Sequence, residues 1–379
     1  MTSAVGGRDS TAGGDHPPVR YGIIGTGMMG CEHILNLMAI DDARVVAVSD
    51  PNQTSRDWAV DCAGREPDLA VFADYRDLLA LDDLDAVVVA TPNVTHVDVL
   101  ADVLATGLAV MVEKPLCTTV ADCLRVKGLA DRRWVERRAM TWVALEYRYM
   151  PTVSRFVTAS QSGVLGSIKM ISIREHRFPF LDKVDNWNRF SANTGGTLVE
   201  KCCHFFDLMN LVVGARPVRV YASGGQDVNH LTEEFARPDG TVGRSDVLDN
   251  AFVIIDYANG ARGSLDLCMF AEGGRYEQEL VAVGDRAKIE TSVPGDSVRV
   301  GPRDGGSIDI PAPLAADVTY EGFHHGSSYR EHQEFIAALR SGRPPSVGVD
   351  DGVWSVAVGA AAHHSIERGR PVLIAEFGL

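Results

Sequence analysis

The sequence GTGMMG at residues 25–30 directly follows the apolar run VRYGII at residues 19–24. It is a G-x-G-x-x-G pattern placed between an expected strand and an expected helix. The first glycine allows a tight turn, the second lets the backbone approach a pyrophosphate, and the third lets helix and strand pack closely. The N–H groups at the helix N-terminus then face the phosphates. The alternative is a tight strand–helix turn that binds no ligand. The predicted dinucleotide site comprises Gly25, Thr26, Gly27, Met28, Met29 and Gly30.

Asp50 stands at the end of the next expected strand. An acidic residue about 20 positions beyond the glycine motif can accept hydrogen bonds from the adenosine ribose hydroxyls, and it repels a 2′-phosphate. Residues 51–53 carry no positive charge, and Arg56 is the first residue that does. The sequence therefore favours NAD over NADP as the cofactor. The alternative is that Asp50 only caps the turn before Pro51.

Strand and helix patterns alternate along residues 19–145. The run AVVVA at residues 86–90 is continuously apolar, which is typical of a parallel strand buried on both faces. Repeated βα units indicate a doubly wound parallel sheet, so we predict an NAD-binding α/β domain over residues 19–145. The expected strands are Val19–Ile24, Arg44–Ser49, Ala86–Ala90, Leu108–Val112 and Met140–Leu145, and the expected helices are Met28–Ala39, Thr54–Ala63, Val94–Ala105 and Thr118–Arg132.

The pattern changes after residue 145, where several strand-like runs follow one another without helices between them. This order indicates a mostly antiparallel sheet, so we predict a second, α+β domain over residues 146–379. Residues 1–18 are small, polar and rich in Gly and Pro, and we expect a disordered tail there. The expected strands are Ser167–Phe178, Arg219–Ala222, Ala251–Tyr257, Gly263–Met269, Leu280–Val283 and Ser297–Val300, and the expected helices are Thr152–Ser160, Thr197–Val213, Tyr329–Arg340 and Val353–Glu367.

Composition and charge argue against several classes of protein. The chain of 379 residues has a net charge of −15, which is unfavourable for binding nucleic acid or an anionic membrane surface. No run approaches the roughly 18 apolar residues that span a membrane, and residues 2–18 lack the apolar core of a signal peptide. The seven cysteines are irregularly spaced and include no CxxC pair, so we expect a reduced, cytoplasmic protein.

Two short motifs follow expected strands of the first domain. The sequence TPNVTH at residues 91–96 follows one strand, and EKP at residues 113–115 follows the next. Ligands bind at the carboxyl ends of the strands in such sheets. The alternatives are a turn and helix-cap role for the first motif and a structural ion pair within the second. We expect the cofactor to contact Thr91, Pro92, Asn93, His96, Glu113 and Lys114.

A third motif opens the expected helix over residues 197–213, in which Glu200, His204 and Asp207 follow Gly195-Gly196. The spacing i, i+4, i+7 places the three side chains on one helical face. A carboxylate one turn before a histidine can orient the imidazole and raise its basicity. Asp207 lies almost two turns from Glu200, so we expect it to be structural. The alternative for His204 is a satisfied histidine in the helix core.

Cys202, Cys203 and His204 are consecutive, which invites a comparison with metal sites. Consecutive side chains on a helix diverge by about 100°, so the two thiols cannot easily share one ion. No second Cys/His pair stands at a finger-like spacing. We therefore predict no metal site.

Taken in order, these motifs resemble the glucose–fructose oxidoreductase / inositol dehydrogenase (Gfo/Idh/MocA) family over nearly the whole chain after the tail. The resemblance implies an N-terminal Rossmann domain and a C-terminal α+β domain with a large open sheet, through which a homodimer or homotetramer would form. It implies C-terminal helices that pack back on the Rossmann domain. It also implies that Lys114 contacts the reacting hydroxyl and that His204 is the acid/base. Glu200 falls where inositol dehydrogenase-like members usually have aspartate, and Lys201 beside it is an unusual basic residue.

The chemistry of alcohol oxidation requires such groups independently of the resemblance. Oxidation of a secondary alcohol removes a hydride and a proton, and histidine is the base best matched to neutral pH. A nearby ammonium such as that of Lys114 favours the developing alkoxide, and nicotinamide accepts the hydride. In the reverse direction His204 would protonate a ketone and Lys114 would polarise it.

Residues 175–190, before the third motif, are rich in basic and aromatic side chains, and in the family this region lies over the substrate pocket. Polyols need hydrogen-bond donors and acceptors, and an aromatic face suits the C–H side of a ring. Basic side chains could also bind a carboxylate or phosphate, and the alternative is a solvated basic strand and loop. The candidate substrate-binding residues are Arg177, Lys183, Trp187, Arg189 and Lys201.

We therefore expect an NAD-dependent dehydrogenase or ketoreductase that acts on a sugar or cyclitol, either inositol-like or an amino-sugar. One alternative is a glycosidase or lyase that uses tightly held NAD for a transient oxidation. Another is a non-catalytic nucleotide-binding sensor, against which the presence of both Lys114 and His204 argues.

Overall fold

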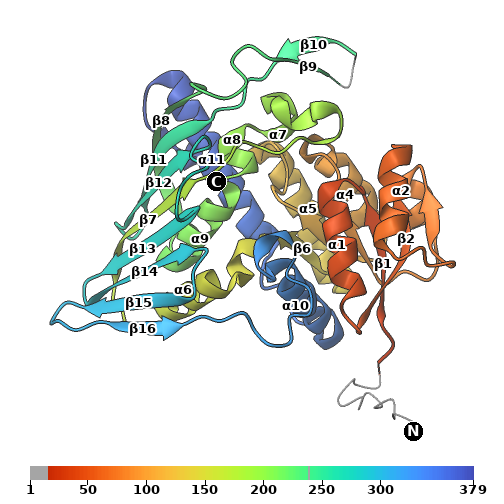
Figure 1. Cartoon of the computed structure of the whole chain (residues 1–379), viewed down its shortest axis with the longest axis horizontal. Coiled ribbons are helices and arrows are strands. Elements are labelled where there is room, and N and C mark those ends of the chain that lie inside the picture. Colours follow the sequence, from red (N-terminus) through yellow and green to blue (C-terminus); the bar gives the residue numbers. More distant parts are fainter. Residues whose placement is uncertain (1–15, 238–239) are drawn as a thin grey trace, which may run out of the picture.

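The computed structural model describes residues 16–237 and 240–379, so residues 1–15 of the predicted tail lie outside the described residues. The described chain has two halves, and each is built on its own large β-sheet (Figure 1). No helix in these ranges is both long and apolar enough to cross a membrane.

The first half contains a six-stranded parallel sheet of order β3-β2-β1-β4-β5-β6. The order reverses between β1 and β4, and ligands bind at such a switch point outside the carboxyl ends of the strands. Every residue of β4 and β5 is buried, as expected for strands covered on both faces. The strands are β1 (Val19–Ile24), β2 (Ala43–Ser49), β3 (Ala70–Phe72), β4 (Ala86–Val89), β5 (Ala109–Glu113) and β6 (Thr141–Ala144). The helices are α1 (Met28–Met38), α2 (Gln53–Cys62), α3 (Tyr75–Leu79), α4 (His96–Ala105) and α5 (Val120–Arg137), with a 3-10 turn η1 (Asn93–Thr95).

The second half contains a nine-stranded sheet of order β16-β15-β14-β13-β7-β12-β11-β8-β17, in which only β7 and β12 run parallel. Helices α6, α9 and α11 lie on one face of this sheet, and the other face is open (Figure 1). The strands are β7 (Ile168–His176), β8 (Pro217–Gly225), β11 (Asn250–Tyr257), β12 (Arg262–Cys268), β13 (Gln278–Gly284), β14 (Ala287–Val293), β15 (Ser297–Pro302), β16 (Ile308–Pro311) and β17 (Val372–Leu373). Strands β9 (Glu234–Ala236) and β10 (Val242–Arg244) form a separate ribbon.

The two longest helices of the second half, α10 and α11, lie near the end of the chain. The helices of this half are α6 (Pro151–Gln161), α7 (Ser191–Thr194), α8 (Thr197–Glu200), α9 (Cys203–Val213), α10 (Ser327–Ser341) and α11 (Val349–Arg368), with 3-10 turns η2 (Glu146–Tyr149), η3 (Val184–Arg189), η4 (Gly322–His324) and η5 (Ile374–Phe377). Trp142 in β6 donates to Glu331 in α10 over 3.0 Å, so α10 is fixed to the first half. A Cβ on Gly352 in α11 would lie 2.9 Å from the Leu116 side chain, which shows how closely α11 approaches it.

The fold class predicted from the sequence is confirmed. The continuous helix predicted over residues 197–213 is wrong, because a turn at Lys201 and Cys202 separates α8 from α9. The N–H of Cys202 donates to the carbonyl of Thr197 five residues earlier, over 3.4 Å, and such a wide turn interrupts the regular ladder. Several short elements were not predicted, among them β3, α3, β14 and β16. In β14 the charged Lys288 and Glu290 alternate with Ala287 and Ile289, a period-two pattern that indicates a half-buried strand and could have predicted it.

Candidate active site between the two sheets

The glycine loop between β1 and α1 has room for a ligand at one position only. Gly25 has φ +88°, and a Cβ there would lie 2.7 Å from the backbone of Ala90. A Cβ on Gly30 would lie 2.0 Å from the carbonyl oxygen of Gly25. A Cβ on Gly27, by contrast, would meet no atom within 4 Å. Packing therefore requires the first and third glycines, and Gly27 faces the open space that a closely approaching ligand needs.

The N-terminus of α1 fits a phosphate group. No side chain caps this helix, and its first turn contains no acidic residue. The hydroxyl of Thr26 is buried and has no hydrogen-bond partner among the described residues. Because the helix dipole and the free N–H groups favour an anion, residues 25–30 would hold the pyrophosphate of a dinucleotide.

Asp50 both caps its own turn and supports the glycine loop. Its Oδ1 accepts a hydrogen bond from the N–H of Asn52, and its Oδ2 accepts one from the N–H of Thr26, each over 2.8 Å. Arg56 folds back so that its guanidinium donates to the carbonyl of Asp50 over 2.6 Å. A positive charge therefore lies at the end of β2, which residues 51–53 alone did not predict.

The loops after β4 and β5 are joined by His96. Its Nδ1 lies 2.9 Å from the carbonyl oxygen of Pro115, and its Nε2 lies 3.0 Å from that of Thr91. Asn93 is buried, and its side-chain amide nitrogen has no partner among the described residues. Asn93 thus retains a donor for a ligand, whereas both nitrogens of His96 are engaged by the protein.

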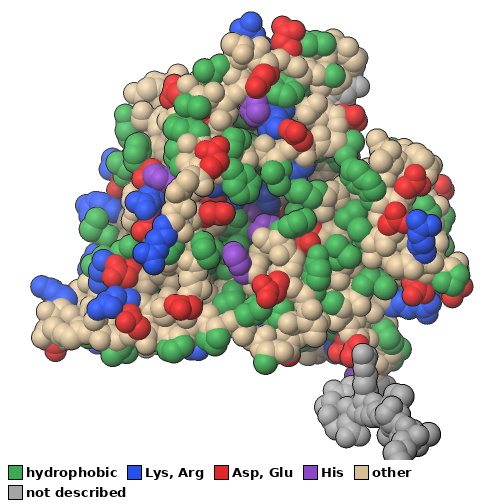
Figure 2. Space-filling view, viewed as in Figure 1, with side chains coloured by type: hydrophobic (Ala, Val, Ile, Leu, Met, Phe, Trp, Pro, Cys, Tyr) green, Lys and Arg blue, Asp and Glu red, His purple; other side chains and the backbone are tan. Residues whose placement is uncertain are grey.

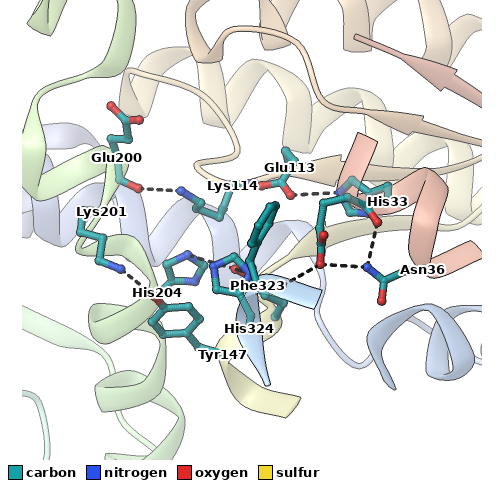
Figure 3. Close-up of polar contacts among 12 residues, drawn as sticks. His33, Asn36, Glu113, Lys114, Tyr147, Glu200, Lys201, His204, Phe323 and His324 are labelled. Carbon is teal, nitrogen blue, oxygen red and sulfur yellow. Dashed lines mark hydrogen bonds and ion pairs between the residues drawn. The ribbon is translucent and has the colours of Figure 1, made fainter. Parts of the chain in front are cut away.

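Glu113 faces the first half of the molecule. Its Oε1 lies 3.0 Å from His33 Nε2 in α1 (Figure 3). His33 Nδ1 in turn lies 2.9 Å from His332 Nε2 in α10. Burial acts to raise the pKa of Glu113, but the contact with His33 and the nearby Lys114 lower it to about 2. Glu113 is therefore an anion that ties α1 to the end of β5, and neither His33 nor His332 was predicted from the sequence.

Lys114 faces the second half of the molecule. Its Nζ donates to the carbonyl oxygen of Glu200 over 3.3 Å (Figure 3). Because the helix breaks after Glu200, that carbonyl also accepts from the Cys203 thiol over 3.4 Å. Burial raises the pKa of the Glu200 carboxyl, and Lys114 and Lys183 oppose this effect. Lys114 and Glu200 thus meet where the two halves join.

His204 is buried and stacks on Tyr147, with 4.0 Å between ring centroids and 9° between ring planes. The predicted pairing with Glu200 is not present, because the break in the helix separates the two residues. The carboxyl group that faces His204 is Glu146, whose Oε1 lies 3.7 Å from His204 Nε2. Burial lowers the pKa of His204 well below its usual value, and Lys114 and Lys201 act in the same direction. The ring is therefore neutral at neutral pH and can accept a proton.

Three of the predicted substrate-binding residues are engaged by the protein. Lys201 Nζ donates to the Tyr147 hydroxyl over 2.6 Å and lies 3.1 Å from Glu175 Oε1. Arg177 Nη1 lies 3.7 Å from the same carboxylate oxygen. Arg189 donates to Asp182 over 2.5 Å. These cations support the walls of the site.

Lys183 and Trp187 remain available to a ligand. The Lys183 ammonium has no hydrogen bond or ion pair to any residue that the structure describes, and it lies 5.9 Å from the centroid of the Trp187 ring. Burial lowers the pKa of Lys183, while Glu200 raises it. Figure 2 shows a hollow in the middle of this face, with basic and histidine side chains at its floor.

Some residues of the site were missed in the sequence, and one signal could have found two of them. Glu146 and Tyr147 follow the carboxyl end of β6 after one residue, Leu145, and position at the carboxyl end of a strand is the rule that identified Lys114 after β5. His324 in η4 and Glu175 in β7 carry no comparable signal. No group of three or more metal-ligating side chains is found in the described part of the chain.

A parallel sheet with a dinucleotide-type glycine loop meets, at its carboxyl edge, a second domain whose helix α9 supplies a histidine, and this arrangement is typical of a two-domain oxidoreductase. Residues 19–136 match the Gfo/Idh/MocA domain described as "Oxidoreductase family, NAD-binding Rossmann fold", and residues 161–374 match "Oxidoreductase family, C-terminal alpha/beta domain". The chain belongs to the Gfo/Idh/MocA family of NAD-binding oxidoreductases.

The chain is similar to inositol dehydrogenases along most of its length. It is 26% identical to myo-inositol 2-dehydrogenase of Thermotoga maritima and 26% identical to inositol 2-dehydrogenase of Rhizobium meliloti strain 1021, in each case over 94% of this chain and 99% of the relative. An oxidoreductase domain protein from Kribbella flavida has a TM-score of 0.82 at 20% identity, covering 95% of this chain and all of that chain, 100%. Levoglucosan dehydrogenase in complex with NADH has a TM-score of 0.80 at 21% identity, with coverage of 94% and 99%. At these identities the solved structures establish the fold.

Proposed function

We propose that the chain is an NAD-dependent dehydrogenase that oxidises a secondary alcohol of a sugar or cyclitol and reduces the ketone in the reverse direction. The observation that carries this proposal is the neutral, buried His204 close to the charged Lys114, beside a glycine loop that fits a dinucleotide. Two inositol 2-dehydrogenases that match over 94% of the chain support a cyclitol as the first substrate to test.

Lys114 and His204 divide the work of the reaction. Burial acts to lower the pKa of Lys114, but Cys203, Glu113 and Glu200 raise it above its usual value, so the side chain remains an ammonium and stabilises an alkoxide. His204 takes the hydroxyl proton, and its Nδ1 has no partner among the described residues. When bound on the glycine loop, NAD supplies the hydride acceptor.

The remaining polar groups suit a polyhydroxylated ring. The carboxyl of Glu200 is buried, and its Oε2 has no hydrogen-bond partner among the described residues, so it can accept from a substrate hydroxyl. Lys183 can donate to another hydroxyl, and the face of Trp187 suits the C–H side of the ring. Arg177, Arg189 and Lys201 hold the surrounding walls. All seven cysteines are unpaired, which supports a cytoplasmic location as part of the same proposal.

The test is the formation of NADH by the purified protein with myo-inositol, other inositols, aldoses, amino-sugars and uronic acids. We expect turnover of at least one cyclic polyol with NAD and slower turnover with NADP. Absence of turnover across the panel, with NAD still bound, would contradict the dehydrogenase. That outcome favours a glycosidase or lyase that oxidises its substrate transiently, which glycosides of the same sugars would then reveal.

A further inference from the structure

Glu146 is a buried carboxyl group placed between two histidines. Its Oε1 lies 3.7 Å from Nε2 of His204 and 3.8 Å from Nδ1 of His324. Its Oε2 is buried without a hydrogen-bond partner among the described residues. A buried carboxyl oxygen without a donor is costly, so its presence at this position requires a reason.

The three side chains form a path from the interior toward solvent. The side chain of His204 is 2% exposed, that of Glu146 is 4% exposed, and that of His324 is 24% exposed. His324 reaches the pair from η4, and its ring lies close to that of His204 (Figure 3). The N–H of the neighbouring Phe323 donates to Glu32 of α1 over 3.1 Å, which fixes η4 in place.

A buried base must pass its proton to water in every turnover. We propose that Glu146 and His324 are relay residues that carry the proton of the substrate hydroxyl from His204 to solvent. This relay rests on the proposed function. The substrate carbon loses a hydride to NAD, and its hydroxyl loses a proton to His204. Glu146, as the carboxylate, takes the proton from His204 and gives it to His324, and His324 gives one to water, so that one proton is released in each oxidation.

Neither histidine has to become a long-lived imidazolium cation during the transfer. A neutral imidazole can take a proton at one nitrogen while it releases the proton of the other, and exchange with water that enters the site when the product leaves restores the first tautomer. The distances of 3.7 and 3.8 Å are longer than hydrogen bonds. In ligand-free sites catalytic hydrogen bonds are often long and tighten when the substrate binds.

The surroundings keep Glu146 able to switch near neutral pH. Burial and the nearby Glu113 raise its pKa, Lys114 and Lys201 oppose them, and the pKa lies at about 8. Burial lowers the pKa of His324 to about 3, so its ring is neutral. Several titratable groups face Glu146 from the elements packed around it. They are Glu113 and Lys114 from the end of β5, Tyr147 from η2, Lys201, Cys203 and His204 from the segment of α8 and α9, His324 from η4, and Glu331 from α10. Arg177 also faces both histidines.

The first test compares His324→Asn with His325→Asn in oxidation of myo-inositol by NAD in a dilute, bulky buffer. We expect His324→Asn to lower turnover about tenfold or more, and added imidazole to restore it, because a small base can replace a partly exposed ring. His325 is the adjacent, exposed histidine, and its variant should retain wild-type turnover. NAD affinity should be unchanged in both variants, which excludes misfolding. Wild-type turnover by His324→Asn, or a loss that imidazole does not restore, would overturn the relay.

The second test uses Glu146→Gln, which keeps the volume and removes the exchangeable carboxyl proton. In the wild type we expect turnover to rise with pH through a group near pH 8, and Glu146→Gln should abolish this step. Imidazole should not restore this variant, because the site of the lost carboxyl is buried. An unchanged pH profile would exclude Glu146 from the relay.

A third measurement needs no turnover and therefore separates the relay from the proposed function. In the ligand-free protein, the ring signals of His204 and His324 in NMR spectra should both shift with one midpoint near pH 8, and Glu146→Gln should remove that shift. If no alcohol is oxidised but both ring signals shift with the same midpoint, the proposed function is contradicted, whereas the coupling of Glu146 to the two histidines is supported. If the wild type oxidises myo-inositol and the rings titrate independently of Glu146, the relay fails alone.

Discussion

Burial acts on Lys114 and His204 in the same direction, yet the two residues end in different protonation states. It lowers the pKa of both, but Lys114 is surrounded by Cys203, Glu113 and Glu200, which restore its charge. His204 is surrounded by Lys114, Lys201 and His324, which lower its pKa further. The site therefore presents a cation and a neutral base side by side, as oxidation of an alcohol requires.

The role of His204 predicts a loss of turnover without a loss of cofactor. We expect His204→Ala to lower kcat by about 10²- to 10⁴-fold, the usual contribution of a general base. The Kd for NAD should change little, because the glycine loop and Asp50 lie in the other half of the molecule. Steady-state kinetics with the substrate found in the panel, together with calorimetric titration of NAD, check this. An unaltered kcat would remove His204 from the mechanism.

Asp50 and Arg56 together predict how the cofactor preference can be changed. We expect Asp50→Ala to weaken NAD binding, because the carboxylate supports Thr26 and would bind the ribose hydroxyls. The same variant should bind NADP more tightly than the wild type does, because the guanidinium of Arg56 is already held at this turn. Fluorescence titration with both nucleotides measures the two changes.

The matched control for Asp50→Ala is the double variant Asp50→Ala/Arg56→Ala. It should lose the gain in NADP affinity and keep the loss in NAD affinity. A wild type that already prefers NADP would show that the interpretation of Asp50 is wrong.

At the scale of elements, the short segment η2 organises much of the site. It follows β6 and carries Glu146, Tyr147 and Arg148 toward α9. Arg148 forms two hydrogen bonds with Asp207 of α9, of which the Nε bond measures 2.7 Å, and its Nη2 lies 2.9 Å from Asp351 of α11. This ion pair fixes the distance between Glu146 and His204, since it joins the two elements that carry them.

The Arg148–Asp207 pair predicts a large loss of stability when one partner is removed. Asp207→Ala leaves the charged Arg148, whose side chain is only 10% exposed, with Asp351 as its remaining carboxylate partner, and should lower the free energy of unfolding by about 3 kcal/mol. Asp351→Ala is the control, because that side chain is 37% exposed and its loss should cost about 1 kcal/mol. Urea unfolding followed by circular dichroism measures both. Equal losses in the free energy of unfolding for the two variants would show that burial of the Arg148–Asp207 pair does not determine its contribution to stability.

The sequence predicts elements well where one local pattern determines them and poorly where packing does. Strands β1, β4 and β5 were predicted from short local patterns. These patterns are the glycine motif, the buried run before Thr91 and the motif at Lys114, and each is recognised from residues adjacent in the chain. The spacing of Glu200, His204 and Asp207 predicts one helix, but the carbonyl of Glu200 is bonded to Lys114 from the other half instead. That contact depends on how the two halves pack against each other, and the periodicity of apolar residues in the sequence does not predict it.

At the scale of the whole molecule, the site is assembled from segments that lie far apart in the sequence. His33, Glu113 and His332 form one buried row, and Glu146, His204 and His324 form a second row that ends at the partly exposed His324. The order of motifs along the chain predicts two halves and the carboxyl edge at which they meet. The order of motifs does not predict which side chains of η2, η4 and α10 lie at this edge. Their positions depend on how the C-terminal helices pack against the first half.

The open face of the nine-stranded sheet predicts a second copy of the chain as its partner. Tyr221, Phe252 and Ile254 are 43%, 66% and 50% exposed on this face, and Ile254 pairs directly with Tyr221 across β11 and β8. A patch of exposed apolar side chains on one sheet is unusual for a monomer, and the family resemblance implies a homodimer or homotetramer at this position.

Light scattering after gel filtration should give a mass of two or four chains for the wild type. Ile254→Glu should shift it toward one chain, because a carboxylate at the centre of an apolar contact is desolvated without a partner. Val135→Glu, at a position 78% exposed on α5 of the first half, should leave the mass unchanged. A monomeric wild type, or an unchanged mass for Ile254→Glu, would mean that the open face serves another purpose than self-association.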